Sequence, residues 1–218
     1  AVPRVFSTGF YYEPDDLVQD SVNAFNDLIN NVAEAKVNLY LKEINKIIAK
    51  AKTSQKIPKK NIKEGSNVTL AEYSKIASTL ARYGGRPLFI ADTLLIDHIA
   101  LQQATATGVS NLLTDKYKTE LLNELNITTI GRTDAMNLVN PFVDDANSIT
   151  ELPVNTGYML AGEGRLKPFT IVEYGGLRQT TDTDFETGRV MMKIFQDASI
   201  NLVFASTLGV IKDESILV

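Results

Sequence analysis

Asp97 and His98 are the first candidates for chemistry to consider, because they place an acid beside an imidazole. An imidazole near neutral pH can act as a general base when a nucleophile or a substrate lies within hydrogen-bonding reach. Adjacent residues of a helix, however, point about 100° apart and do not face each other. The chain has 1 histidine, which excludes mechanisms that need two imidazoles and most zinc sites. We therefore interpret His98 as a structural residue.

Acidic residues offer two further candidates for chemistry. Asp182, Asp184 and Glu186 alternate, as ligands of a hard cation could, but glycine and glutamate do not stand at the positions that an EF-hand loop requires. An acidic turn is the favoured interpretation. Asp144 and Asp145 could form a carboxylate pair, although neighbours on a loop are usually only solvated. Neither cluster predicts a site.

Phosphate binding is suggested by two segments, each with a simpler explanation. The tripeptide at 162–164, Gly-Glu-Gly, is too short for a phosphate cradle and is expected between strands rather than before a helix. The lysine-rich segment 50–63 could contact phosphates, but Pro58 and Gly65 break regular structure there, so we expect an exposed, solvated loop. We predict no catalytic, cofactor-binding or metal-binding residue in this chain, and no cofactor.

Composition agrees with that prediction. The chain has 218 residues, 44% hydrophobic and 22% charged, with a net charge of -4 and 0 cysteines. This excludes a wholly disordered chain, and the absence of thiols excludes disulfides and thiol catalysis. A pI of about 5.1 argues against a dedicated nucleic-acid-binding domain. No apolar run approaches the roughly 20 residues that span a bilayer, and no P-loop or dinucleotide fingerprint occurs.

The first half of the chain predicts a strand and a very long helix. Residues 3–12 are rich in β-branched and aromatic residues and predict a strand. Residues 15–52 repeat apolar residues at helical spacing and predict one helix; its register slips once, at 33–36, which is where any break or bend would fall. A core-facing seam explains this stripe, and a coiled coil is the alternative that the register slip counts against.

Shorter elements follow the long helix. The segment 69–72, Thr-Leu-Ala-Glu, is a capping box that opens a helix ended by the glycines at 84–85. Beyond it we expect a strand at 86–91, a helix capped by Asp92, a helix at 114–125 and a strand at 127–130. Residues 133–156 are expected to be loop-rich. Four short strands are expected after that, at 157–161, 168–174, 189–195 and 202–204.

This order of elements resembles that of the major capsid proteins of tailed bacteriophages, the Hong Kong 97 fold. The resemblance rests on that order and on three stretches of sequence: GRPLFIADTLLIDHIALQQ, NTGYMLAGEGRLKPFTIVEYGGLRQ and GRVMMKIFQDASINLVFASTLGVI. It implies an α+β fold with a long spine helix, a peripheral P-domain, an axial A-domain and part of the extended E-loop. The implied boundaries are 1–14 for the returning limb of the E-loop, 15–85 for the P-domain, 86–180 for the A-domain, and 181–218 for the return of the chain to the P-domain.

The resemblance also implies a function and partners. Copies of such a subunit form pentamers and hexamers of an icosahedral shell that encloses double-stranded DNA without sequence specificity. Scaffolding, portal and decoration proteins are further partners, no membrane is involved, and the shell assembles in the bacterial cytoplasm and persists in the virion. A closely related alternative is an encapsulin-type compartment around an enzyme cargo. A small α/β enzyme domain and a binding module that uses segment 50–63 are less favoured.

Because the chain starts inside a predicted strand, the resemblance suggests a processed or trimmed subunit without the N-terminal arm and the first limb of the E-loop. On that basis residues 3–12 are expected to be an unpaired edge, either mobile or paired with a neighbouring copy. We also expect this chain alone to be a monomer or a small oligomer in dilute solution.

Overall fold

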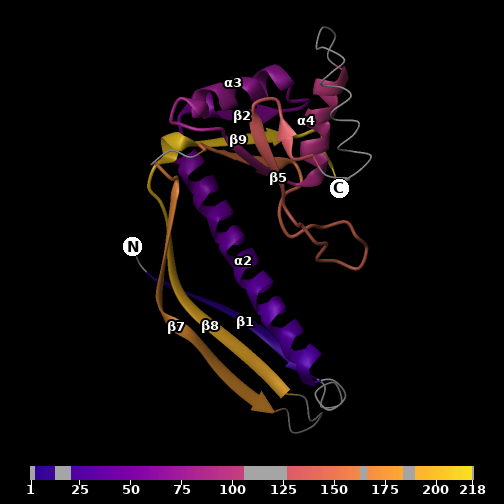
Figure 1. Ribbon diagram of the computed structural model, residues 1–218, viewed down its shortest axis with the longest axis vertical. Coiled ribbons are helices and arrows are strands. Elements are labelled where there is room, and N and C mark those ends of the chain that lie inside the picture. The colour runs from indigo at the N-terminus through magenta and orange to yellow at the C-terminus, as the bar shows by residue number, and fades with distance from the viewer. Residues whose placement is uncertain (1–2, 13–20, 106–126, 163–165, 184–189, 218) are drawn as a thin grey trace. The chain divides into compact units, whose positions relative to one another are not determined.

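The computed structural model describes residues 3–12, 21–105, 127–162, 166–183 and 190–217 and divides the chain into two compact units (Figure 1). Unit 1 contains residues 1–50 and 169–202, and unit 2 contains residues 51–168 and 203–218. The chain therefore leaves the first unit and returns to it, as the predicted order of elements requires. The names P-domain and A-domain, with their predicted boundaries, stay predictions.

Unit 1 is built on a three-stranded antiparallel sheet in the order β1-β8-β7. Strand β1 (Arg4–Tyr12) pairs with β8 (Val190–Leu202) along its whole length, and β8 pairs with β7 (Phe169–Thr183) on its other side. The expectation that residues 3–12 form an unpaired edge is therefore wrong. Their partner is a distant strand of the same chain, which satisfies one row of their backbone groups.

Strands β7 and β8 are much longer than the sequence predicts. Both run through polar or glycine-containing stretches that lie outside the predicted strands, 175–183 in β7 and 196–201 in β8. At the glycines of β7 the ladder shifts between Tyr174 and Arg178, and Gly175 has a φ of 70° that favours glycine. The sheet absorbs the glycines as a bulge, because pairing with β8 resumes on the far side.

Helix α2 (Ser21–Thr53) forms the spine, with 33 residues in one uninterrupted helix. It continues through 33–36, so the predicted slip of the apolar register produces no break in the helix. Residues 15–20, where the capping aspartates were expected, lie outside the described residues. The side chains of α2 from residue 35 onward show how this helix holds the sheet of unit 1.

Tyr40 is the centre of the contact between α2 and the sheet. Its ring packs edge-on against Phe6 of β1, with centroids 5.0 Å apart, and its hydroxyl donates to Glu173 Oε1 of β7 at 2.9 Å. Lys36 Nζ approaches the same carboxylate at 2.7 Å. Burial, followed by the hydrogen bond to Glu173, raises the pKa of Tyr40 to about 12. One face of α2 thus holds both edge strands of the sheet.

Unit 2 is a mixed six-stranded sheet with two helices. Its strand order is β2-β9-β6-β3-β5-β4, with β2 parallel to β9 and β3 parallel to β5. The strands are β2 (Ile62–Gly65), β3 (Leu88–Ala91), β4 (Thr129–Ile130), β5 (Thr133–Asn137), β6 (Thr156–Leu160) and β9 (Leu208–Asp213). Short 3-10 turns at Lys59–Asn61 and Ala205–Thr207 precede β2 and β9.

Strands β2 and β5 were predicted as loops. Strand β2 starts at the end of the lysine-rich segment 50–63. It is fixed beside β9 by Asn61, whose fully buried amide donates to the carbonyl oxygens of Ser206 and Leu208 at 2.8 and 3.1 Å. Strand β5 has the sequence TDAMN, which carries a weak β signal, but its neighbours β3 and β4 supply its ladder partners. Tertiary pairing therefore overrides local propensity in both places.

Helices α3 (Leu70–Ala81) and α4 (Thr93–Thr105) cover this sheet. Helix α3 packs on β6 and β9, α4 packs on β4 and β5, and the two helices contact each other. A side chain at Gly209 of β9 would collide with Ile76 of α3, so glycine permits the close approach of this helix. The fully buried core of the unit includes Leu80, Phe89, Leu95, Ile96, Ile99, Ile130, Met159 and Ile211.

Both predicted starts of these helices are confirmed. Glu72 N donates to Thr69 Oγ1 at 3.4 Å and Thr69 N donates to Glu72 Oε2 at 3.1 Å, a complete capping box. At α4, Asp92 Oδ1 accepts from Leu94 N at 2.9 Å. Gly84 and Gly85 follow α3 with positive φ, as the sequence indicates for the end of a helix. The predicted helix at 114–125 lies outside the described residues.

Replacing Thr69 with alanine should lower the free energy of unfolding by about 1 kcal/mol, because the backbone amide of Glu72 in the first turn of α3 loses its acceptor, Thr69 Oγ1. Thr79→Ala is the matched control: its hydroxyl only bonds back to Lys75 O within the helix, so it should change stability by no more than a few tenths of a kcal/mol. Urea unfolding followed by circular dichroism measures both variants. Equal losses would contradict a capping role for Thr69.

Candidate functional site

Asp97 and His98 do not act on each other in the structure. His98 Nε2 lies 3.4 Å from Asp213 Oδ2 of β9 and 3.1 Å from Gln102 Nε2 of its own helix. Burial and the nearby Asp92 raise the pKa of Asp97. The two side chains thus have different neighbours, as helical geometry predicts, and no nucleophile is placed beside the imidazole among the described residues.

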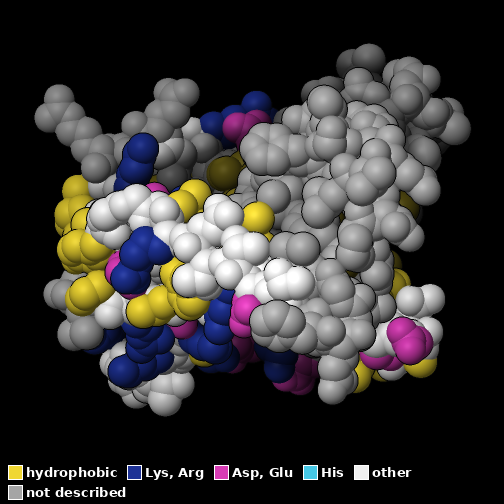
Figure 2. Space-filling model, turned by 90° about the horizontal axis from the view of Figure 1, so that it is seen from below, with side chains coloured by type: hydrophobic (Ala, Val, Ile, Leu, Met, Phe, Trp, Pro, Cys, Tyr) yellow, Lys and Arg dark blue, Asp and Glu magenta, His cyan; other side chains and the backbone are white. Residues whose placement is uncertain are grey.

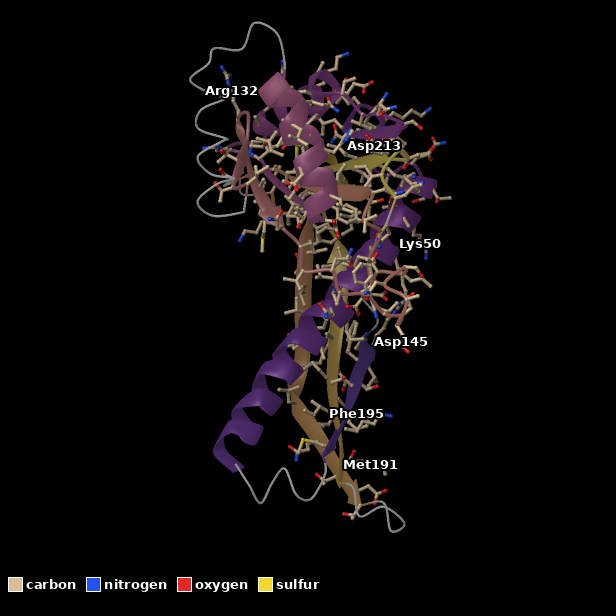
Figure 3. All side chains as sticks on the ribbon, turned by 90° about the vertical axis from the view of Figure 1, so that its right-hand side faces the viewer. Lys50, Arg132, Asp145, Met191, Phe195 and Asp213 are labelled. Atoms are coloured by element: carbon tan, nitrogen blue, oxygen red, sulfur yellow. The ribbon has the colours of Figure 1, made fainter. Side chains whose placement is uncertain are left out.

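Asp213 is a structural centre that sequence analysis did not single out. Its side chain is fully buried, and it accepts from Asn67 N at 2.9 Å, from Val68 N at 2.6 Å and from Ser215 Oγ at 2.6 Å. Figure 3 labels its position in unit 2. Burial alone would raise the pKa of this carboxyl, but these hydrogen bonds outweigh burial and hold the pKa below its ordinary value. Asp213 therefore fastens the end of β9 to the segment that enters α3.

The remaining polar candidates are also dispersed. Asp182 lies within β7 rather than in a turn, so that part of the prediction is wrong, and Asp184, Glu186 and residues 163–164 lie outside the described residues. In segment 50–63, Lys52 pairs with Glu64 and Lys63 pairs with Glu72, which neutralises part of its charge. Within the described ranges, no three acidic or histidine side chains converge as metal ligands would, and no helix is long and apolar enough to cross a membrane.

Exposed apolar surface is the feature that stands out instead. Along β7 every residue from Thr170 to Thr183 is exposed, including Ile171 and Val172, which point to opposite faces of the sheet. The space-filling view shows apolar side chains lying at the surface between lysine and arginine side chains (Figure 2). Exposed apolar side chains gathered on one ordered strand make that strand a candidate surface for contact with another protein.

A second exposed apolar group lies in unit 2, in residues 138–152 between β5 and β6. We call this segment the apolar hairpin, because Phe142 bridges to Thr150 and Val143 N donates to Ile149 O at 2.8 Å. It extends from the end of β5 away from the sheet (Figure 1). Its exposed fractions are high for apolar residues: Val139 85%, Phe142 49%, Val143 60% and Ile149 58%.

The hairpin is held in shape by two polar side chains. Asp144 accepts from Ser148 N at 3.0 Å, from Ile149 N at 2.6 Å and from Ser148 Oγ at 2.6 Å. These bonds, with that from Ser148 Oγ the strongest contributor, lower the pKa of Asp144. Asn140 donates to Asp92 Oδ2 at 2.8 Å and accepts from Leu152 N, which ties the base of the hairpin to the start of α4. Asp144 and Asp145 are therefore no carboxylate pair, since Asp144 closes the loop.

A groove of about 850 Å³ opens at another place in unit 2. It lies between α3 and the starts of β3 and β5, and Tyr73, Ala77 and Ile130 form its apolar part. Ser74 and Ser78 line the α3 side, and Arg86 and Arg132 supply positive charge. Sequence analysis missed both the groove and the hairpin. The apolar residues among the loop residues 138–152 were the one available signal for the hairpin.

The fold is similar to solved structures of phage particles and of an encapsulin. A structure of Microbacterium phage Oxtober96 matches 98% of this chain and 73% of that chain, with a TM-score of 0.60 and 8% identity. The satellite phage P4 procapsid matches 97% of this chain and 70% of that chain, with a TM-score of 0.50 and 11% identity. The holo-SrpI encapsulin complex from Synechococcus elongatus PCC 7942 matches 97% and 74%, with a TM-score of 0.52 and 10% identity. The chain thus has the Hong Kong 97-type capsid fold, as its sequence predicts.

Sequence comparison identifies the particular family. The profile of the family described as "SPbeta prophage-derived putative capsid protein YonB" matches residues 1–212, and the chain belongs to this family. The "SPbeta prophage-derived uncharacterized protein YonB" of Bacillus subtilis (strain 168) is 58% identical over 215 residues, which are 99% of this chain and 64% of that protein. The chain therefore spans slightly less than two thirds of this curated relative. The chain thus belongs to a family described as a putative prophage capsid protein and has the fold that phage capsids and encapsulins share.

Asp213→Asn should destabilise the protein by about 1–3 kcal/mol at neutral pH, because an amide offers one acceptor oxygen where the carboxylate serves Asn67 N and Val68 N with two. The pKa of Asp213 lies below its ordinary value of about 3.9, so the stability that its charge provides is complete above that pH and is lost as the pH falls through the folded-state pKa. Urea unfolding at a series of pH values from 7 downward should show the variant and the parent converging in acid. Asp145→Asn, at an exposed position, is the control and should track the parent at every pH.

Asp144→Ala should loosen the apolar hairpin while leaving the rest of unit 2 intact. The backbone amides of Ser148 and Ile149 and the Ser148 hydroxyl lose their acceptor. Exchange of the two amides with deuterium should therefore become faster. The adjacent Asp145→Ala removes an exposed carboxylate and should leave the exchange unchanged. Equal exchange in the two variants, measured by mass spectrometry of peptides, would show that Asp144 does not hold the hairpin.

Proposed function

We propose that this chain is a subunit of a closed protein shell, in which copies associate as pentamers and hexamers of an icosahedral capsid around double-stranded DNA. Membership of a phage capsid family over residues 1–212 and the capsid fold support this proposal. The observation that carries it is the exposed apolar surface. Ordered apolar side chains on β7 and on the hairpin lie open to solvent in the single chain, and contact with other copies would bury them.

Within this proposal the parts of the chain take the roles that the resemblance implies. Residues 15–85 with the spine helix belong to the P-domain, 86–180 to the A-domain, 1–14 to the E-loop limb, and 181–218 to the return of the chain. The pairing of β1 with β8 and the contact of α2 with β1 and β7 support a common body for the spine and the returning strands. The site of action is the virion, after assembly in the bacterial cytoplasm.

DNA is proposed as contents rather than as a sequence-specific ligand. The net charge of -4 favours weak contact with packed DNA, since like charges repel at close range. Scaffolding, portal and decoration proteins are proposed as further partners of the assembled shell. We propose no catalytic activity, because the polar residues that could carry chemistry serve in this structure as ties between elements, as His98, Asp144 and Asp213 do.

An encapsulin-type compartment is the second candidate, favoured by the similarity to the SrpI encapsulin complex, whose chain is covered to 74%. The two candidates share the shell and differ in what it encloses. Nucleic acid inside the particle, protected from nuclease until the shell is opened, supports the capsid. A co-purified protein in place of nucleic acid supports the compartment.

The shell itself is tested by negative-stain electron microscopy and sedimentation of the purified chain over a range of concentrations. In dilute solution we expect a monomer or a small oligomer, and rings or closed particles should appear as the concentration rises, because association removes exposed apolar surface from water. Val172→Asp, which adds a charge on an exposed position of β7, should shift the distribution toward monomer. Thr180→Asp is its matched control at an exposed polar position of the same strand and should assemble nearly as the parent does. A protein that stays monomeric up to its solubility limit would contradict the proposal.

A further inference from the structure

The apolar hairpin and the groove lie at opposite ends of the same pair of strands. Strands β3 and β5 are parallel, with Leu88 opposite Asp134 and Ala91 opposite Asn137. The groove is lined by residues 85–87 and 130–132, which precede the two strands, whereas the hairpin 138–152 follows β5. Five residues of strand extend about 16 Å. The hairpin of one copy therefore points away from the groove of that copy.

The chemistry of the groove fits an acidic and apolar occupant. Its floor of Tyr73, Ala77 and Ile130 is apolar, and its volume of about 850 Å³ falls in the range of roughly 300–1,000 Å³ that suits a bound ligand. Arg132 is exposed, and Arg86 keeps half of its side chain accessible beside Asp134, at 3.0 Å. No acidic side chain belongs to the described residues that line the groove.

The hairpin has the complementary character. Its exposed side chains are apolar at Val139, Phe142, Val143 and Ile149. Its charged residues are Asp144, Asp145 and Glu151, with no lysine or arginine in 138–152. The bonds of Asp144 and Asn140 fix its backbone in the free chain. A segment that is already ordered loses little conformational entropy on docking, which favours binding.

We propose that the apolar hairpin of one copy docks into the groove between α3 and the starts of β3 and β5 of the next copy. This inference rests on the proposed function and identifies one contact within the shell. Two different patches at opposite ends of one unit form a heterologous, head-to-tail contact, and repetition of such a contact closes into a ring when the rotation permits. A pentamer or hexamer is such a ring.

Disulfide crosslinking tests this contact cleanly, because the chain has 0 cysteines. One protein carries Val143→Cys on the hairpin, and a second, affinity-tagged protein carries Ser78→Cys on the groove side of α3; both positions are exposed. After mild oxidation of the mixture, the tagged heterodimer should exceed that of the control pair roughly tenfold or more, because docking raises the local thiol concentration. The control pair combines Val143→Cys with Ser66→Cys, an exposed serine of the same unit outside the groove.

A further variant tests the charges. Arg132→Glu places an acid at the groove, so it should reduce the crosslinking of Val143→Cys with Ser78→Cys several-fold, and higher salt should weaken the crosslinking of the parent pair. Rings or shells that form while the two pairs crosslink equally would overturn this contact and leave the proposed function standing. Absence of any assembly in microscopy and sedimentation, with no crosslinking above the control, would overturn both.

Discussion

Unit 1 depends on one constraint: its three-stranded sheet is covered only in part by the rest of the chain. One helix, α2, reaches the three-stranded sheet through Tyr40, which contacts β1 by ring packing and β7 by a hydrogen bond. The rest of β7 stays exposed on both of its faces from Thr170 to Thr183. A domain normally buries its sheet against a second layer from the same chain. Here apolar surface stays exposed to water, and its burial is favourable. In the proposed shell, other copies would supply the missing layer.

Much of this fold could be predicted from local patterns. The spine helix, the capping box of α3, the aspartate that caps α4 and the strand at 3–12 each depend on residues near in sequence, and each is confirmed. Strands β2 and β5 could not be predicted, because distant partners supply their pairing and Asn61 is held by carbonyl groups of residues 206 and 208. The long strands β7 and β8 were underestimated for a related reason: pairing with each other carries them through glycine and polar stretches.

The candidate site shows the same division. Helical geometry was enough to predict that Asp97 and His98 do not face each other, but the partner of His98 is Asp213, 115 positions away in the chain and visible only in three dimensions. The groove is lined by residues of α3, of the segment before β3 and of the β4–β5 turn, so no single stretch of sequence predicts it. The hairpin had one signal in the sequence: apolar residues near Asn140-Pro141, in a region that was predicted only as loop-rich.

The bulge in β7 has a consequence for which changes in length the sheet tolerates. Gly175, Gly176 and Leu177 lie opposite the single residue Gln196, so β7 carries two more residues than its partner at this point. An even excess preserves the alternation of side chains, and Arg178 can accordingly reach Asp197, the residue opposite Tyr174, at 2.6 Å. Loss of both glycines would restore an uninterrupted ladder with the same two faces. Loss of either glycine alone would leave one extra residue in β7, the count of an ordinary β-bulge, so the strand can lose one or two residues here and still pair with β8 on both sides.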